Sequence, residues 1–483
     1  MKKKFILFIL PGIIVVLFLI GCKNLINEVI PELDNTREKM YQHLDQFQTE
    51  LEERFAYLKV NNVDYKTAVQ SVRDKVTNGI SMDELGIELR KIIGLFIDCH
   101  ASVTGFSYGQ GFLPFLVEPI GDRYVAFWSD HSGFIEPSFP FITKIDDINI
   151  DDWCTYLKPL IPKGSPQYIK IHALRILGYL QFARTIVGLE QSSHLTVELE
   201  SKDRSTKKSL QLSVSDQLLY PVAWPDSDSH IMAGNIGYLR ITGWGEEAFA
   251  EVATWMPQFH DTDGLVIDIR HNPGGTRNVL RDLYPYFVKE SEKPRIAGVA
   301  KYRLYSGFGP DHLESRHMYP QDWSGWTSAE QNAITEFMQT FKPEWDAPGD
   351  EFSDWHFWVL SKKSNPGAYD YTKPVVFLMD QRCFSASDVI LSSVKGMPNV
   401  TLVGSSSGGG SGAAISTYLK NSQFKLRLSS MASFQSSGKL FDSRGVDPDI
   451  FMEPVPEHFL ENGPDQILDL AIQIISNNML KQD

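Results

Sequence analysis

The chain has 483 residues, of which 42% are hydrophobic and 22% charged, and these proportions are ordinary for a soluble globular protein. A chain of this length has room for two or three domains around a large hydrophobic core. The formal net charge of −14 argues against a nucleic-acid-binding protein, because such proteins need a basic surface.

The N-terminus has the pattern of a processing segment. Lys2-Lys3-Lys4 form a positive n-region, and the apolar run over residues 5–20 is shorter than the roughly 20 residues of a membrane-spanning helix. The run ends in Leu19-Ile20-Gly21-Cys22, which resembles the lipobox of bacterial lipoproteins. The resemblance implies a signal peptide over residues 1–21 and lipidation of Cys22. An uncleaved anchor or an ordinary secretory signal is the alternative.

Three further cysteines are Cys99, Cys154 and Cys383, and an odd count does not form a disulfide framework. Each is more simply read as a small buried hydrophobe. No cysteine pair has zinc-site spacing, and no set of His, Asp and Glu has convincing metal spacing. The sequence therefore predicts no cofactor and no metal.

Residues 22–110 are predicted to be helical. Apolar residues recur at helical spacing from Met40 to Leu58, after a capping pair of Asn35 and Glu38. Further helices are predicted over residues 65–76 and from the capping box of Ser81 and Glu84 onward. The last of them leads into Asp98-Cys99-His100.

Residues 111–221 are predicted to form a small β domain. Its expected elements are strands over 112–119, 124–128 and 141–148, one helix over 171–185, and a hairpin of 195–199 with 208–214. The segment is weakly similar to the PDZ-like domain of processing proteases, although no glycine-rich carboxylate-binding loop stands out.

Residues 222–455 alternate strands and helices, which is typical of an α/β domain. The expected strands are 236–242, 264–269 and 374–379, and the expected helices are 246–258, 276–288 and 387–395. Residues 302–371, which contain one predicted helix near 328–341, interrupt this alternation and are interpreted as an insertion. The insertion is a structural elaboration, a lid or a partner surface. An amphipathic helix over 466–480 is predicted within the C-terminal segment 456–483.

Ser385 lies where a predicted strand turns sharply into a helix. At a helix N-terminus, the unpaired backbone N–H groups and the positive end of the dipole favour a developing oxyanion. Ser385 could instead only cap the helix. Cys383 is a second possible nucleophile, but it lies in the turn and not at the helix start. A serine nucleophile needs a base, and among the twelve histidines His100 could equally be a dipole partner at the end of its helix.

Five motifs in chain order resemble those of the tail-specific, or C-terminal processing, serine peptidase family. They are Asp98-Cys99-His100-Ala101, the pair 237–241 and 264–275, Ser385-Ala386-Ser387-Asp388, the strand 400–404 with the glycine loop 408–410, and 445–450. In the Ser–Lys branch of this family, the base is a lysine of the glycine loop, and the matching position here is Gly410. The chain is therefore more similar to the tricorn-like branch, which uses a histidine.

The resemblance implies that Ser385 is the nucleophile, His100 the general base and Asp442 the acid that orients the base. The family usually has glutamate at the last position. Aspartate is one methylene shorter, so the backbone must compensate or the contact weakens. Asp442 could also be an ordinary turn residue before a strand.

The resemblance further implies an oxyanion hole formed by the amide of Ala386 with that of Gly275 or Gly274. The two glycines could also serve only as a strand-to-helix turn. The implied fold is α/β, with a crotonase-like ββα spiral as catalytic core, an N-terminal helical bundle and a small PDZ-like β domain.

The expected function is a lipid-anchored extracytoplasmic serine endopeptidase in the cell envelope of a bacterium, which hydrolyses protein or peptide substrates through an acyl-enzyme. We expect the lipid anchor to be its contact with the membrane, and we expect no nucleic-acid partner. The sequence does not determine the oligomeric state. Two alternatives remain: a non-catalytic member of the same fold that binds hydrophobic ligands or peptides, and a structural surface lipoprotein.

Overall fold

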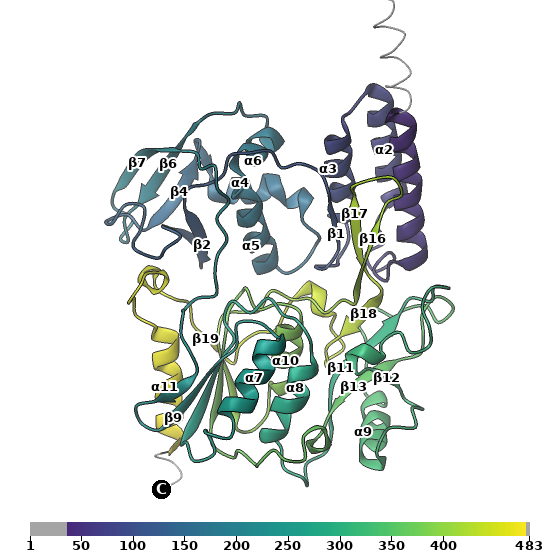
Figure 1. Ribbon diagram of the computed structural model, residues 1–483, viewed down its shortest axis with the longest axis vertical. Helices are drawn as coiled ribbons and strands as arrows, with labels where there is room; N and C mark the ends of the chain where they lie inside the picture. The colour runs from purple at the N-terminus through teal and green to yellow at the C-terminus, as the bar shows by residue number, and fades with distance from the viewer. Residues whose placement is uncertain (1–35, 480–483) are drawn as a thin grey trace, which may run out of the picture.

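The computed structural model describes residues 36–479. The predicted signal peptide, Cys22 and the cap at Asn35 lie outside these residues. The described chain forms two tiers, with the N-terminal helices and the β domain in one and a large α/β sheet in the other (Figure 1). Within residues 36–479, no helix combines the length and apolarity that crossing a membrane requires.

The N-terminal helices follow the predicted pattern. They span residues 36–54, α2 (Tyr65–Asn78) and α3 (Met82–Ile93). The apolar stripe of the first helix is buried, and the predicted capping box of Ser81 and Glu84 is present at the start of α3. Gly79 ends α2 with a φ of 89°, a left-handed conformation that glycine adopts at little cost.

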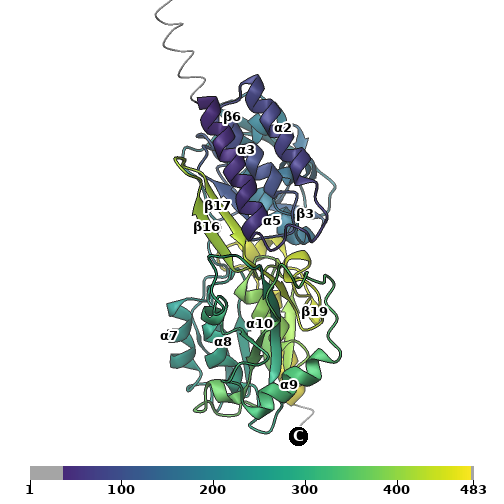
Figure 2. The same ribbon diagram turned by 90° about the vertical axis from the view of Figure 1, so that its right-hand side faces the viewer.

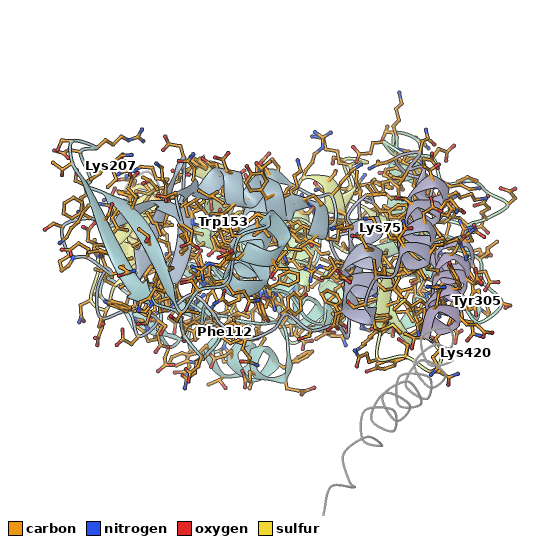
Figure 3. The ribbon with its side chains drawn as sticks, turned by 90° about the horizontal axis from the view of Figure 1, so that it is seen from above. Lys75, Phe112, Trp153, Lys207, Tyr305 and Lys420 are labelled. Carbon is orange, nitrogen blue, oxygen red and sulfur yellow. The ribbon has the colours of Figure 1, made fainter. Side chains whose placement is uncertain are left out.

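The β domain is one antiparallel sheet flanked by helices. Its strands are β2 (Leu116–Ile120), β3 (Arg123–Phe127), β4 (Phe141–Ile145), β5 (Ile148–Asn149), β6 (His194–Glu200) and β7 (Lys207–Ser213), and β5 pairs only with β4. The predicted hairpin is confirmed, because Leu195 pairs with Leu212 across β6 and β7. In the view from above, Trp153 and Lys207 lie on the β-domain side and Lys75 on the helical side (Figure 3).

The single helix predicted over residues 171–185 is wrong. The structure has α5 (Pro166–Leu177) and α6 (Leu180–Val187), and a further helix α4 (Ile150–Leu157) that the sequence reading missed. The break occurs because the loop before β2 takes the backbone groups that a continuous helix would use. The Gly178 carbonyl accepts from the amide of Leu113, and the Gln181 amide donates to the Gly111 carbonyl.

The α/β sheet has the order β19-β15-β14-β10-β9-β8. Its strands are β8 (His230–Met232), β9 (Ile236–Arg240), β10 (Gly264–Asp268), β14 (Val375–Met379), β15 (Val400–Gly404) and β19 (Ile450–Phe451). Only β8 runs antiparallel to its neighbour. The central strands are buried along their whole length, as parallel strands covered on both faces are.

Helices cover both faces of this sheet (Figure 1). They are α7 (Glu246–Trp255), α8 (Asn278–Leu283) and α10 (Ala386–Val394) on one face and α11 (Gln466–Met479) on the other. Helix α8 is shorter than the predicted 276–288, because Pro285 lies in the 3₁₀ turn that follows it. The structure is thus a mixed α/β fold.

The segment 302–371 contains more regular structure than the single helix expected from its sequence. Besides α9 (Ser328–Met338), it supplies β12 (Tyr319–Pro320) and β13 (His356–Leu360). These strands join β11 (Arg295–Tyr302) and β18 (Met431–Phe434) in a sheet of order β12-β13-β11-β18. The segment is therefore part of the packed structure, because β13 pairs with β11.

A small sheet joins the two tiers. Its strands are β1 (Ser102–Thr104), β16 (Ala414–Tyr418) and β17 (Lys425–Ser429), in the order β1-β17-β16. The hairpin of β16 and β17 extends from the α/β tier along the N-terminal helices (Figure 2). Because β1 pairs with β17, the segment that begins at Asp98 is held against the α/β core.

Candidate active site

Ser385 stands at the first turn of α10 in a strained backbone conformation. Its φ of 61° and ψ of −110° are rare for a residue with a side chain, and such strain costs on the order of 1–3 kcal/mol. Its hydroxyl makes no capping bond to the helix, so the capping alternative is wrong. The turn is fixed from the side, because the Phe384 amide donates to the Asn272 carbonyl at 3.1 Å. The hydroxyl is therefore aimed away from its own helix.

His100 meets this hydroxyl from the N-terminal part of the chain. Its Nε2 lies 3.0 Å from the Oγ of Ser385, and its ring packs on Phe384 with 4.7 Å between the centroids. The His100 amide donates to the Asp98 carboxylate at 2.9 Å, which fixes the backbone before the ring. Two residues 285 positions apart in sequence thus lie at the distance that a nucleophile and its base require.

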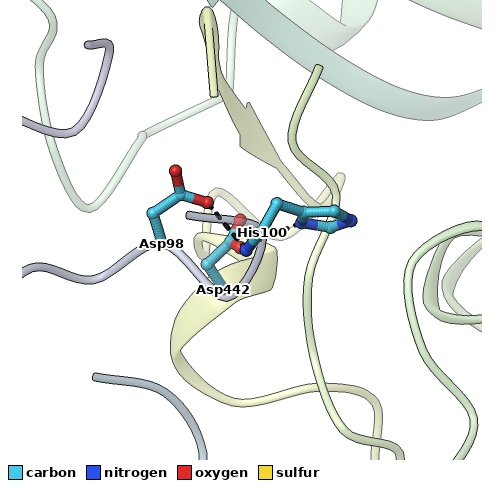
Figure 4. Close-up of side chains that lie close together, drawn as sticks. All are labelled: Asp98, His100 and Asp442. Carbon is cyan, nitrogen blue, oxygen red and sulfur yellow. Dashed lines mark hydrogen bonds and ion pairs between the residues drawn. The ribbon is translucent and has the colours of Figure 1, made fainter. Parts of the chain in front are cut away.

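Asp442 lies near the other ring nitrogen but is not hydrogen-bonded to it. Its Oδ1 is 3.8 Å from Nδ1 of His100, and the Gly412 amide donates to this nitrogen instead, at 3.3 Å (Figure 4). The Asp442 carboxylate accepts from the Tyr57 hydroxyl at 2.7 Å and from the Cys99 amide at 3.1 Å. The Asp442 carboxylate therefore stops just beyond hydrogen-bond distance of Nδ1, and a small movement would bring the two into contact.

Asp98 is a second buried carboxylate beside the histidine. It accepts from the Ser429 amide at 3.0 Å and the Ser429 hydroxyl at 2.8 Å, besides the His100 amide. Burial and the neighbouring charge of Asp442 raise the pKa of Asp98 to about 6. Ligand-type atoms of Asp98, His100 and Asp442 lie within 4.8 Å of one another. The oxygens of both carboxylates already accept protein hydrogen bonds, so the cluster is read as a hydrogen-bonded support for His100.

The two amides best placed for an oxyanion are those of Gly275 and Ala386. Within the described residues, neither donates to a protein acceptor, and both residues line the cleft beside Ser385. The Gly274 amide is already engaged, because it donates to the Asn272 side chain at 2.9 Å. Gly274 has a steric role, since a Cβ there would come within 2.7 Å of the Ser385 Cβ. Of the two sequence candidates, the geometry favours Gly275.

Cys383 does not face the cleft. Its side chain is fully buried, and its Sγ lies 3.0 Å from the carbonyl of Ile269. Burial also raises the pKa of this thiol well above its ordinary value. These observations exclude Cys383 as the nucleophile, because a reactive cysteine needs an accessible thiolate.

A buried ion network anchors the turn that carries Gly275. Arg270 Nη2 lies 2.6 Å from Asp268 and 2.7 Å from Asp465, and the Tyr238 hydroxyl donates to Asp268 at 2.8 Å. Arg240 adds a weaker contact to Asp268 at 3.3 Å. The network fixes the end of β10, from which residues 269–275 run toward Ser385.

We expect Asp268→Asn to destabilise the protein by about 3–5 kcal/mol, because it leaves buried Arg240 without a carboxylate and Arg270 with Asp465 alone. Burial opposes ionisation, yet Arg270 and Arg240 hold the pKa of Asp268 well below its ordinary value. This stabilisation is therefore present above about pH 4, the range of an unfolded aspartate, and is lost as the pH falls further. Urea unfolding at pH 7 and at lower pH would measure both effects. A loss at pH 7 no larger than that of the exposed control Asp122→Asn would contradict the expectation.

A cleft of about 920 Å³ opens in front of Ser385. His100, Gly275 and Ala386 line it together with β1, the start of β2 and residues 218–223. The cleft therefore lies between the two tiers, and its volume is in the range of ligand-binding sites.

Several residues of the site had no readable sequence signal. Tyr57 follows the first helix as one of many aromatic residues, and Ser429 lies in an ordinary strand. Gly412 belongs to a glycine-rich loop in which no single position stands out. Their roles depend on contacts across hundreds of residues, as between Tyr57 and Asp442.

Comparisons with known proteins find one matching family model. Residues 235–452 match the model of Peptidase family S41. The carboxyl-terminal-processing protease of Synechocystis sp. (strain ATCC 27184 / PCC 6803 / Kazusa) is 31% identical over 99 residues, which are 20% of this chain and 23% of that protein. The match thus spans about a quarter of that relative's length.

Among solved structures, mature CPAF superposes with a TM-score of 0.65 at 18% identity, covering 92% of this chain and 98% of that one. Mature CPAF complexed with lactacystin gives a TM-score of 0.61 at 18% identity, with 92% and 99% covered. At these identities the likeness is one of fold. The family match and the homologue support a serine peptidase. Residues 235–452, which hold Ser385, Gly275 and Asp442, are therefore similar to Peptidase family S41.

Proposed function

We propose that the protein is a serine endopeptidase that hydrolyses peptide bonds of proteins through an acyl-enzyme on Ser385. The observation that carries the proposal is the 3.0 Å contact between Ser385 Oγ and His100 Nε2, at the start of α10 and inside the cleft. A serine hydroxyl becomes nucleophilic when an adjacent base takes its proton. Here the base is an imidazole already within hydrogen-bond reach.

The reaction follows from this arrangement. Ser385 Oγ attacks the carbonyl carbon while its proton passes to His100 Nε2, and the oxyanion that forms accepts from the amides of Gly275 and Ala386. When the C–N bond breaks, the leaving amine takes the proton from His100. Water then attacks the ester carbonyl, gives a proton to His100 and releases the acid, and Ser385 regains its proton. Asp442 stabilises the imidazolium once its carboxylate turns toward Nδ1.

The substrate would bind in extended form. Strand β1 follows His100 and pairs with β17 on one side only, while Ser102, Val103 and Thr104 line the cleft. A free strand edge offers unpaired backbone groups to a peptide, which can add as a further strand. The scissile bond would then lie beside the catalytic histidine.

We further propose the finer assignments that the sequence suggests. The core is a crotonase-like spiral, and residues 111–221 are a PDZ-like accessory domain. The protein is a lipoprotein of a bacterial cell envelope, held outside the cytoplasm by acyl chains on Cys22. Metabolic labelling with an alkynyl fatty acid would test the anchor, since Cys22→Ser should remove the label and release the protein from membranes.

A fluorophosphonate probe tests the proposed chemistry, because such probes modify activated serines. We expect the wild-type protein to be labelled at Ser385 and the Ser385→Ala and His100→Ala variants to be unlabelled. Lactacystin, with which mature CPAF was crystallised, offers a competing reagent that should reduce labelling. A folded wild-type protein that binds peptide or apolar ligand but takes up no probe would favour a non-catalytic member of the fold.

A further inference from the structure

The cleft is strongly basic although the protein is acidic. The chain has 60 acidic residues against 46 Lys and Arg. Six arginines nevertheless line the cleft, and no Asp or Glu is among the described residues that do so: Arg90, Arg175, Arg277, Arg316, Arg382 and Arg427. A cleft lined by one sign of charge between low-dielectric walls concentrates ligands of the opposite sign.

Most of these charges have no counter-charge from the protein. Within residues 36–479, Arg382 pairs with Glu118, and the other five form no ion pair with a carboxylate. Buried arginines elsewhere in the described chain are paired, such as Arg184 with Asp146 and Arg270 with Asp268. Among the buried arginines of residues 36–479, Arg277 in the cleft is thus the one without a carboxylate partner.

Arg277 is the most deeply placed of them. Only 6% of its surface is exposed, and its guanidinium donates to the Ser411 hydroxyl at 2.5 Å and contacts the sulfur of Met318 at 3.3 Å. It also lies 5.6 Å from the ring centre of Trp358. Its partners are thus neutral. Removing a guanidinium from water without an anion is costly, so a ligand that supplies the anion would recover that cost.

Two further arginines belong to the same group. Burial and the charge of Arg316 lower the pKa of Arg277, and burial and the charge of Arg427 lower the pKa of Arg316 to about 10. Arg427 lies on β17, directly opposite Ser102 on β1, and Ser102 itself follows His100 by two residues. Arg277 lies two residues after Gly275, whose amide faces the cleft. The group Arg277, Arg316 and Arg427 therefore lies along the cleft that contains Ser385.

We propose that Arg277, Arg316 and Arg427 bind a carboxylate of the peptide substrate, so that the enzyme selects peptides with an anionic group close to the scissile bond. The proposal rests on the proposed peptidase function and adds its substrate class. Guanidinium groups suit this role because their fixed fork of N–H donors matches the two oxygens of a carboxylate. Because an endopeptidase cleaves inside a chain, the carboxylate is that of a Glu or Asp side chain near the scissile bond.

Binding to the Ser385→Ala protein tests the proposal without turnover. Three fluorescent peptides of one sequence would be compared by anisotropy: one with Glu and an amidated C-terminus, one with Gln and a free C-terminus, and one with Gln and an amide. We expect the Glu peptide to bind about 10- to 100-fold more tightly than the neutral one, as charged hydrogen bonds contribute. Tighter binding of the free C-terminus than of Glu would contradict the side-chain assignment. Equal binding of all three would overturn the proposal.

Variants locate the effect. Arg316→Gln and Arg277→Gln in the Ser385→Ala background should each lower the ratio of neutral to carboxylate Kd about tenfold, and added salt should lower it further. The ratio is unchanged by partial misfolding, which weakens all three peptides alike, so it remains decisive if Arg277→Gln folds poorly. Arg204→Gln, an exposed arginine paired with Asp122, is the matched control and should leave the ratio unchanged. An unchanged ratio in folded Arg316→Gln and Arg277→Gln would contradict the assignment.

The two proposals fail in different ways. Fluorophosphonate labelling of the wild-type protein with equal cleavage of acidic and neutral peptides would contradict the proposed carboxylate site and support the peptidase function. Carboxylate-selective binding without labelling would remove the peptidase and leave the site.

Discussion

Ser385→Ala should lower kcat/KM for peptide hydrolysis by at least about 10⁴-fold, because it removes the atom on which the proposed acyl-enzyme forms. The residual rate would come from the oxyanion donors and substrate binding alone. Within residues 36–479 the hydroxyl has one protein partner, His100, and it is half-buried, so its loss should cost little stability. Steady-state kinetics with a quenched fluorescent peptide would measure the rate, and thermal unfolding would check the fold.

Two companion variants sharpen this result. His100→Ala should lower kcat/KM about as much as Ser385→Ala does. The double variant should be no slower than either single variant, because the two groups act as a unit. Ser385→Gly removes the same hydroxyl but also relieves the positive φ of 61°, so it should be inactive and slightly more stable. Peptide hydrolysis by purified Ser385→Ala at a rate near that of the wild type would contradict the assignment of Ser385 as the nucleophile.

Local sequence features predicted the parts of the site that depend on local geometry. The buried strand, the short turn and the helix around Ser385 are signalled by an apolar run, turn residues and helical spacing, and the structure has β14 and α10 there. The same reading could not give the strained φ of Ser385, because strain depends on neighbours such as Asn272 that lie far away in sequence. Nor could it choose between Gly274 and Gly275, since the choice depends on which amide already has an acceptor.

Two of the differences between the predicted and the observed elements share one cause. The break between α5 and α6 follows from hydrogen bonds to the loop at Gly111, and β13 exists as a strand because β11 lies beside it. In both cases a partner distant in sequence decides the local structure, and local propensity is overridden. At the candidate active site, the contact of Asp442 with Tyr57 likewise joins two residues that are far apart in sequence.

Asp442→Asn is the second variant with a large expected effect, about 10²- to 10⁴-fold in kcat. For His100 Nε2 to accept the serine proton, Nδ1 must carry a hydrogen, and an acid orients that tautomer. In the structure the Gly412 amide points its hydrogen at Nδ1, which holds the ring in the opposite tautomer. The active state therefore requires the Asp442 carboxylate, now 3.8 Å from Nδ1, to replace Gly412. An asparagine amide lacks the negative charge that favours this exchange and stabilises the imidazolium.

Tyr57→Phe is the matched control for Asp442→Asn, because it removes a hydrogen bond to the acid and keeps its charge. If the charge of Asp442 is what matters, Tyr57→Phe should lower kcat by no more than about tenfold, because the carboxylate keeps its charge and its hydrogen bond from the Cys99 amide. If the position of the acid is what matters, Tyr57→Phe and Asp442→Asn should lower kcat by about the same factor. Asp442→Asn with kcat within twofold of the wild type would mean that the His100 tautomer is set without the acid. His100 and Ser385 would then work as a dyad, with the ring held by its packing on Phe384.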